Sequence, residues 1–155
     1  MPHDIALQAS ALIDHIQTRY HEGHRRALPE LLIMASALEA RGVADGIVHA
    51  LQLFGAQLEQ HMFKEEMRLF PMMEQGGNTL IGQLIADLHR EHVEHGDTMQ
   101  SLRDCIRGLE SLPDADPVLL KLAQGIHTLA SELKQHIDTE DDVLFPMFQR
   151  PEPAI

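Results

Sequence analysis

The chain has 155 residues, of which 44% are hydrophobic, and 24 acidic residues against 12 basic ones give it a net charge of −12. That length suits a single domain, and so acidic a chain, with no basic cluster larger than His24-Arg25-Arg26, is not expected to bind nucleic acid. No apolar run reaches the roughly 18 residues of a membrane-spanning helix. The first residues lack the pattern of a signal peptide, so we expect a cytoplasmic protein with no membrane association.

Helical periodicity dominates the chain, and no segment shows the alternation of a β-strand. Apolar residues recur at helical spacing over residues 4–40, 47–73, 79–109 and 117–147, with Gly-, Asn- or Pro-containing connections between them. Pro29 is expected to bend or restart the first helix near residue 27. Four long helices with short loops predict an all-α, up-down-up-down four-helix bundle. We therefore expect one domain over residues 1–155, with its bundle core over about 4–149.

The second and fourth predicted helices end in the same pattern. HMFKEEMRLFPMM begins at His61 and HIDTEDDVLFPMF begins at His136, and both contain a His, a Glu four positions later, and then Leu-Phe-Pro-Met. Residues i and i+4 lie one above the other on a helix, so each His–Glu pair can reach one metal ion or two adjacent ones. In an up-down bundle these two helices run parallel, so the pairs would lie at one height and face each other across the core.

A single His-x-x-x-Glu pair is commonly an exposed surface pair or a buried hydrogen bond. Two such pairs opposed within a core are different, because buried carboxylates repel each other unless a cation lies between them. The flanking Met62, Phe63 and Ile137 favour burial. The repeat is therefore best explained by a metal site.

The other two predicted helices offer further imidazole ligands. The first carries His15, His21 and His24, and the third carries His89, His92 and His95. One from each would complete a set of four His and two Glu, enough for two cations about 3.5 Å apart. Imidazole and carboxylate ligands without thiolate suit iron or manganese, and zinc is also compatible.

Four blocks of the sequence together resemble the hemerythrin-like (HHE) domain of the RIC family, named for repair of iron centres. They are LIDHIQTRYHEGHRRALPEL at 12–31, HMFKEE at 61, EHVEHG at 91 and HIDTEDDVLFP at 136, and the resemblance runs over about residues 11–149. It implies a di-iron centre in the middle of a four-helix bundle, with an oxo- or hydroxo-bridge when oxidised. The iron ligands that it implies are His21, His61, Glu65, His92, His136 and Glu140.

The sequence also departs from this family pattern. Full-length members carry an N-terminal cysteine-containing module, whereas the helical pattern here begins near residue 4. Oxygen-carrying hemerythrins have His-x-x-x-His on the third helix, but Gly96 stands four residues after His92, which predicts open coordination. Asp141, five residues after His136, is a rival of Glu140. His24 and His95 are candidates for hydrogen bonds to the ligands or for an additional ligand.

The resemblance implies a non-haem di-iron protein that reacts with nitric oxide or oxygen species. Such a protein would act in nitrosative or oxidative stress and would donate iron to iron–sulfur proteins. Two other hypotheses stay open: a sensor or carrier of O2 or NO without turnover, and a store of divalent metal. Whether the protein is an enzyme is left open, and a monomer or homodimer is expected. His3, His15, His49 and His127 are expected outside the site.

Overall fold

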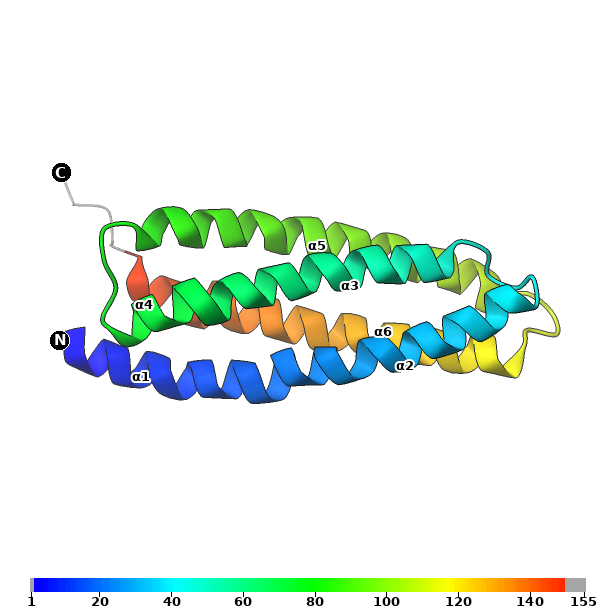
Figure 1. The fold of residues 1–155 in the computed structure, drawn as a ribbon, viewed down its shortest axis with the longest axis horizontal. Coiled ribbons are helices and arrows are strands. Elements are labelled where there is room, and N and C mark those ends of the chain that lie inside the picture. The colour runs from blue at the N-terminus through cyan, green and yellow to red at the C-terminus, as the bar shows by residue number, and fades with distance from the viewer. Residues whose placement is uncertain (1, 150–155) are drawn as a thin grey trace.

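The computed structural model describes residues 2–149, and every regular element within them is helical. The elements join end to end into four long rods that run up and down, with connections at the ends of the bundle (Figure 1). The rods are α1 (Pro2–His15), η1 (Ile16–His21) and α2 (Glu22–Ala40); α3 (Ile47–Lys64), η2 (Glu65–Leu69) and α4 (Phe70–Glu74); α5 (Ile81–Glu110); and α6 (Pro117–Thr139), η3 (Glu140–Leu144) and η4 (Phe145–Phe148). The predicted all-α four-helix bundle is confirmed.

The packing of the rods places the two sequence repeats opposite each other. α2 packs against α3 and α6, and α5 packs against the same two helices, so α3 and α6 lie diagonally across the bundle. Both run from the end of the bundle where α2 connects to α3 towards the end that holds the N-terminus (Figure 1). The repeats at the ends of α3 and α6 therefore lie at one height.

The core consists of two apolar clusters with a polar layer between them. One cluster lies towards the end where α2 connects to α3 and contains Phe54 and Ile126. The other lies towards the N-terminal end of the bundle and contains Ile13 and Phe70. On every rod, buried His or Glu residues fall between the residues of the two clusters. Water is thus excluded from the polar layer along the bundle axis on both sides.

Three of the rods contain a wide π-helical turn beside this polar layer. In η2 the N–H of Phe70 bonds to the carbonyl of Glu65, five residues back, and the second repeat makes the same bond between Phe145 and Glu140. In each repeat the proline follows at the next position, where no N–H is available to continue the α-helical pattern. Such turns are frequent at functional sites. The Leu-Phe-Pro segment of each repeat thus lies at a local widening of the helix that follows the glutamate.

Two local predictions differ from the structure. α2 continues through Pro29, so the first helix does not restart near residue 27; Pro29 stands at an exposed position of this helix. Phe63 is 56% exposed, because a residue two positions after His61 lies about 200° around the helix from it. Met62, one position after His61, is fully buried as predicted.

Within residues 2–149, no helix is long and apolar enough to span a lipid bilayer. The predicted domain also includes residues 1 and 150–155, which lie outside the described residues, as does the side chain of His3.

Candidate metal centre

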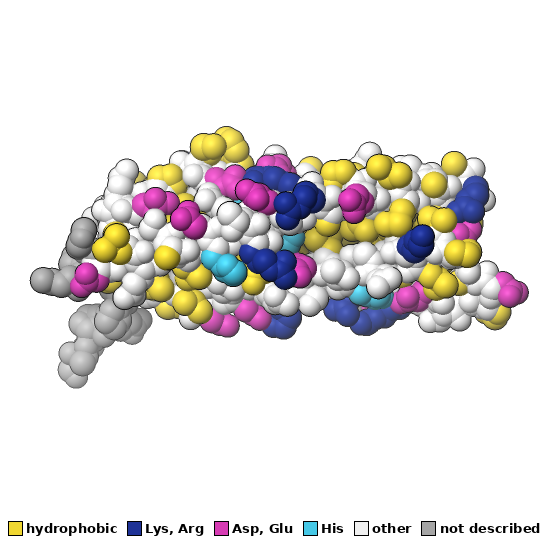
Figure 2. Space-filling view, turned by 90° about the horizontal axis from the view of Figure 1, so that it is seen from below, with side chains coloured by type: hydrophobic (Ala, Val, Ile, Leu, Met, Phe, Trp, Pro, Cys, Tyr) yellow, Lys and Arg dark blue, Asp and Glu magenta, His cyan; other side chains and the backbone are white. Residues whose placement is uncertain are grey.

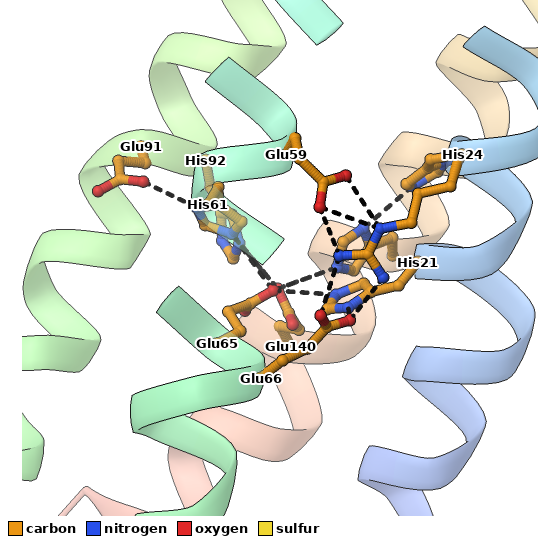
Figure 3. Close-up of polar contacts among 11 residues, drawn as sticks. His21, His24, Glu59, His61, Glu65, Glu66, Glu91, His92 and Glu140 are labelled. Atoms are coloured by element: carbon orange, nitrogen blue, oxygen red, sulfur yellow. Dashed lines mark hydrogen bonds and ion pairs between the residues drawn. The ribbon is translucent and has the colours of Figure 1, made fainter. Parts of the chain in front are cut away.

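Six ionisable side chains from all four rods meet in the polar layer, and all six are buried. Figure 3 labels His21, His61, Glu65, His92 and Glu140, which point towards one another from the surrounding helices. They are the six residues that the family resemblance implies, His21, His61, Glu65, His92, His136 and Glu140. The structure brings every one of them together, although the two repeats lie far apart in the sequence.

The six residues form two groups of potential ligands that share both glutamates. Group A consists of His21 and His136 with Glu65 and Glu140, and group B consists of His61 and His92 with the same two glutamates. Within each group, one ligand atom from every residue lies within 4.8 Å of the others. Each carboxylate is therefore placed between two pairs of imidazoles, which is the arrangement needed to bridge two cations.

The distances within the groups are those of close polar contact. Oε1 of Glu65 lies 3.1 Å from Nε2 of His21 and 3.5 Å from Nε2 of His61. Oε1 of Glu140 lies 2.8 Å from Nε2 of His92 and 3.3 Å from Nε2 of His136. Each glutamate thus contacts imidazoles of both groups.

Several buried polar atoms in this layer lack a partner of the kind that a cation would provide. Oε2 of Glu65 and Oε2 of Glu140 are buried and accept no hydrogen bond within residues 2–149. Burying a carboxylate oxygen without a partner is costly. The Nε2 atoms of His61 and His92 lie 3.1 Å apart, so their lone pairs repel unless a proton or cation lies between them. The donor set therefore fits metal ions.

Each of the four histidines points Nε2 into the layer and Nδ1 away from it. The outward Nδ1 atoms face Glu66 for His21 at 2.8 Å, Glu91 for His61 at 3.0 Å, Asp141 for His92 at 2.8 Å, and Nε2 of His24 for His136 at 3.1 Å. An Nδ1–H that donates to such an acceptor fixes the ring and leaves the Nε2 lone pair free for a metal. The outer residues therefore hold the imidazoles in the form that binds metal.

Charged side chains hold two of the outer carboxylates in turn. Arg25 donates to both oxygens of Glu66, at 2.8 and 2.9 Å, and Lys64 donates to Glu91 at 2.6 Å. The sequence did not identify Glu91 as a partner of the inner histidines, because Glu91 lies on a different rod from His61, which it contacts. Its only signal in the sequence is its position directly before His92. The acidic residues Glu66 and Asp141 recur five positions after the histidine of each repeat.

The carboxylates also control protonation of the layer. Burial opposes protonation of His92, but hydrogen bonds to Asp141 and Glu140 raise its pKa to about 9. Burial likewise opposes protonation of His136, and the charge of Glu140 raises its pKa to about 9. Burial, reinforced by the charge of His136, lowers the pKa of His24 to about 3, so His24 is a neutral acceptor. A metal ion that bound Nε2 of His92 or of His136 would compete with this protonation.

The other histidines divide into neighbours of the site and surface residues. His24 and His95 are buried beside the ligands, and the ring of His95 lies 5.1 Å from that of His61. Nδ1 of His95 has no hydrogen-bond partner among the described residues, and His95 is in neither group. His15, His49 and His89 are exposed, whereas His127, expected at the surface, is half-buried against Glu110.

A groove of about 580 Å³ between α2 and α6 reaches the outer side of group A. His24 forms part of its lining, together with Leu31 and Leu129. On the face of the bundle shown in Figure 2, charged side chains of both signs gather near mid-length, and apolar side chains appear towards both ends. His24 therefore separates this groove from His136.

Comparison with known proteins assigns the chain to a family. The model of the hemerythrin HHE cation binding domain matches residues 12–148. The chain belongs to this family. The chain is similar to proteins named iron-sulfur cluster repair protein YtfE: 34% identical over 146 residues to that of Cronobacter sakazakii, and 36% identical over 141 residues to those of Escherichia coli and Escherichia fergusonii.

These matches cover 91% and 87% of the chain but only 66% and 64% of the relatives. The chain thus spans somewhat less than two thirds of the length of the curated relatives that it matches. The predicted resemblance to RIC-type repair proteins is confirmed, and a cation-binding role agrees with the buried His and Glu cluster.

Proposed function

We propose that the polar layer holds two iron ions, one in each group, bridged by the carboxylates of Glu65 and Glu140. The observation that supports this most strongly is that both groups share these two glutamates, each of which has a buried oxygen without a hydrogen-bond partner in the described part of the chain. Four Nε2 atoms and two shared carboxylates give each ion two nitrogen and two oxygen donors. An ion that prefers six ligands would keep positions for small molecules.

We further propose that the protein reacts with nitric oxide or oxygen species and takes part in recovery of iron–sulfur clusters in the cytoplasm. The names of its relatives as iron-sulfur cluster repair proteins support this role. When bound, a pair of ferrous ions supplies electrons and vacant coordination positions. The chain's own contribution is to hold four imidazoles with Nε2 inward, to offset the positive charge with carboxylates, and to exclude bulk water.

The experiment that tests this proposal is metal analysis together with the visible spectrum. Protein purified without chelator and reconstituted anaerobically should contain two irons per chain, and its spectrum should change on addition of nitric oxide. One metal per chain or fewer after full reconstitution would contradict the proposed centre. A stable oxygen complex that survives repeated deoxygenation would favour a carrier, and metal uptake without any response to nitric oxide would favour storage.

A further inference from the structure

The outer carboxylates Glu66 and Asp141 occupy equivalent places, because each lies five residues after the histidine of its repeat. Glu66 has a permanent counter-cation, the guanidinium of Arg25, whose nearest nitrogen lies 2.8 Å away. Asp141 contacts only imidazoles, Nδ1 of His92 at 2.8 Å and Nδ1 of His89 at 3.2 Å. No Lys or Arg within residues 2–149 forms an ion pair with Asp141.

The residue equivalent to Arg25 on the other half of the bundle is Gly96. Arg25 lies four residues after His21, and Gly96 lies four residues after His92. A Cβ atom at Gly96 would meet nothing within 4 Å. The second half therefore has no counter-cation side chain at the place that Arg25 occupies in the first.

His89 provides a metal-binding side chain at this place. It lies one turn before His92 on α5, and its side chain is 57% exposed, against 18% for Asp141. Both residues line a surface pocket of about 440 Å³. Two ligands at about 2.1 Å from a metal and at a right angle to each other are about 3 Å apart. The separation of 3.2 Å between His89 Nδ1 and Asp141 Oδ1 fits such a pair.

We propose that His89 and Asp141 form an exposed binding site for a divalent transition-metal cation, and that this site stages the ion that enters group B. Water would complete the coordination of the ion, as is usual at open sites. Asp141 also accepts a hydrogen bond from His92, whose Nε2 points into the layer, so the staged ion lies one imidazole ring away from the buried ligands. The staging role rests on the proposed function; the binding of a cation to the exposed pair does not.

Binding is tested with Mn²⁺, counted by electron paramagnetic resonance during titration of iron-reconstituted protein. We expect the unmodified protein to bind one more Mn²⁺ per chain than His89→Ala, and His89→Glu to keep the additional ion because a carboxylate can replace the imidazole. Gly96→Arg should lose it with both ligands still present, since the guanidinium would pair with Asp141. His49→Ala, which removes an exposed histidine from α3, is the matched control and should bind as the unmodified protein does. Equal Mn²⁺ binding by the unmodified protein and His89→Ala would overturn the site.

Staging is tested by the rate at which chelator-treated protein takes up Fe(II) under anaerobic conditions. We expect His89→Ala to slow uptake several-fold while the final iron content stays at the level of the unmodified protein. An unchanged rate would overturn the staging role. Failure of the unmodified protein to take up any iron would instead contradict the proposed function, and the difference in Mn²⁺ between the two proteins would still report on the exposed pair.

Discussion

Group A and group B have equivalent inner residues but different surroundings. Nδ1 of His61 in group B faces the carboxylate of Glu91, at 3.0 Å, whereas Nδ1 of the equivalent His136 in group A faces the neutral imidazole of His24. The residue of group A that is equivalent to Glu91 is Tyr20, because each directly precedes the inner histidine of its rod. Tyr20 stacks on His136 with ring centroids 5.5 Å apart and planes 6° from parallel.

This difference separates two properties of the site. In the proposed centre the inner residues set how many cations can bind, since two imidazoles and both carboxylates are available to each group. The outer residues determine how basic each imidazole is, because a carboxylate acceptor increases ligand basicity more than a neutral one. We therefore expect group B to hold its ion more tightly, and group A, which borders the groove behind His24, to exchange its ion more readily.

The largest expected effect comes from a residue that both groups share. Glu140→Gln removes one of two carboxylates from each group, so we expect the variant to lose most of its bound iron from both. Asp141→Asn is the matched control, because Asp141 contacts only outward-facing nitrogen atoms, and it should keep two irons at equilibrium. Elemental analysis after anaerobic reconstitution measures both. Iron loss in Asp141→Asn with retention in Glu140→Gln would reassign the bridging carboxylate.

A smaller effect, confined to one group, is expected at His24. His24→Ala leaves Nδ1 of His136 without its acceptor, and loss of such a partner typically weakens metal binding about 10- to 100-fold. One of the two ions should then become easier to remove, as measured by competition with a chelator. His95→Ala is the control, since His95 holds the equivalent place and its Nδ1 makes no hydrogen bond in the described part of the structure.

His24→Glu tests the same difference in the opposite direction. A carboxylate behind His136 would make group A resemble group B, so the two ions should leave at more similar rates. If His24→Ala and His95→Ala weakened the same ion equally, the unequal surroundings would not explain the difference between the groups.

A pH effect common to both groups is expected in chelator-treated protein. The pKa of His92 and that of His136 are each raised to about 9 from an ordinary value near 6.5, so protonation of both favours the folded state. This stability is fully present below about pH 6.5 and is lost as the pH rises through 9. The urea concentration at the midpoint of unfolding of chelator-treated protein should therefore decrease as the pH is raised from about 6.5 to about 9. A midpoint that rises with pH would contradict these pKa shifts.

The sequence predicted whatever depends on spacing along a single helix. Four rods follow from apolar periodicity, and the His–Glu pairs follow from residues four apart on one helix face. Spacing alone did not show which of His15, His21 and His24 is the candidate ligand. Only the family resemblance indicated His21. The structure gives the physical reason, because His15 faces solvent and His24 packs behind His136.

The outer partners of the histidines could not be predicted, because they are set by contacts between rods. Glu91 follows no spacing rule relative to His61, which lies on another helix 30 residues earlier. The wide turns in η1, η2 and η3 were also missed, although the repeated proline marks two of them. Phe70 and Phe145 directly follow η2 and η3, and their rings stack on His21 and His92 of other rods, contacts that spacing along one helix does not predict.

The smallest expected effect concerns the ring that covers group A. Tyr20 is buried, and its hydroxyl makes no hydrogen bond to another described residue, so its contribution comes from the ring stacked on His136. Tyr20→Phe keeps that ring. We expect the chelator concentration that removes either ion to stay within about twofold of the value for the unmodified protein. Tyr20→Leu removes the flat surface and should make the group A ion easier to extract while leaving the group B ion unchanged. If Tyr20→Phe weakened binding as much as Tyr20→Leu, the hydroxyl rather than the stacked ring would be the part of Tyr20 that supports His136.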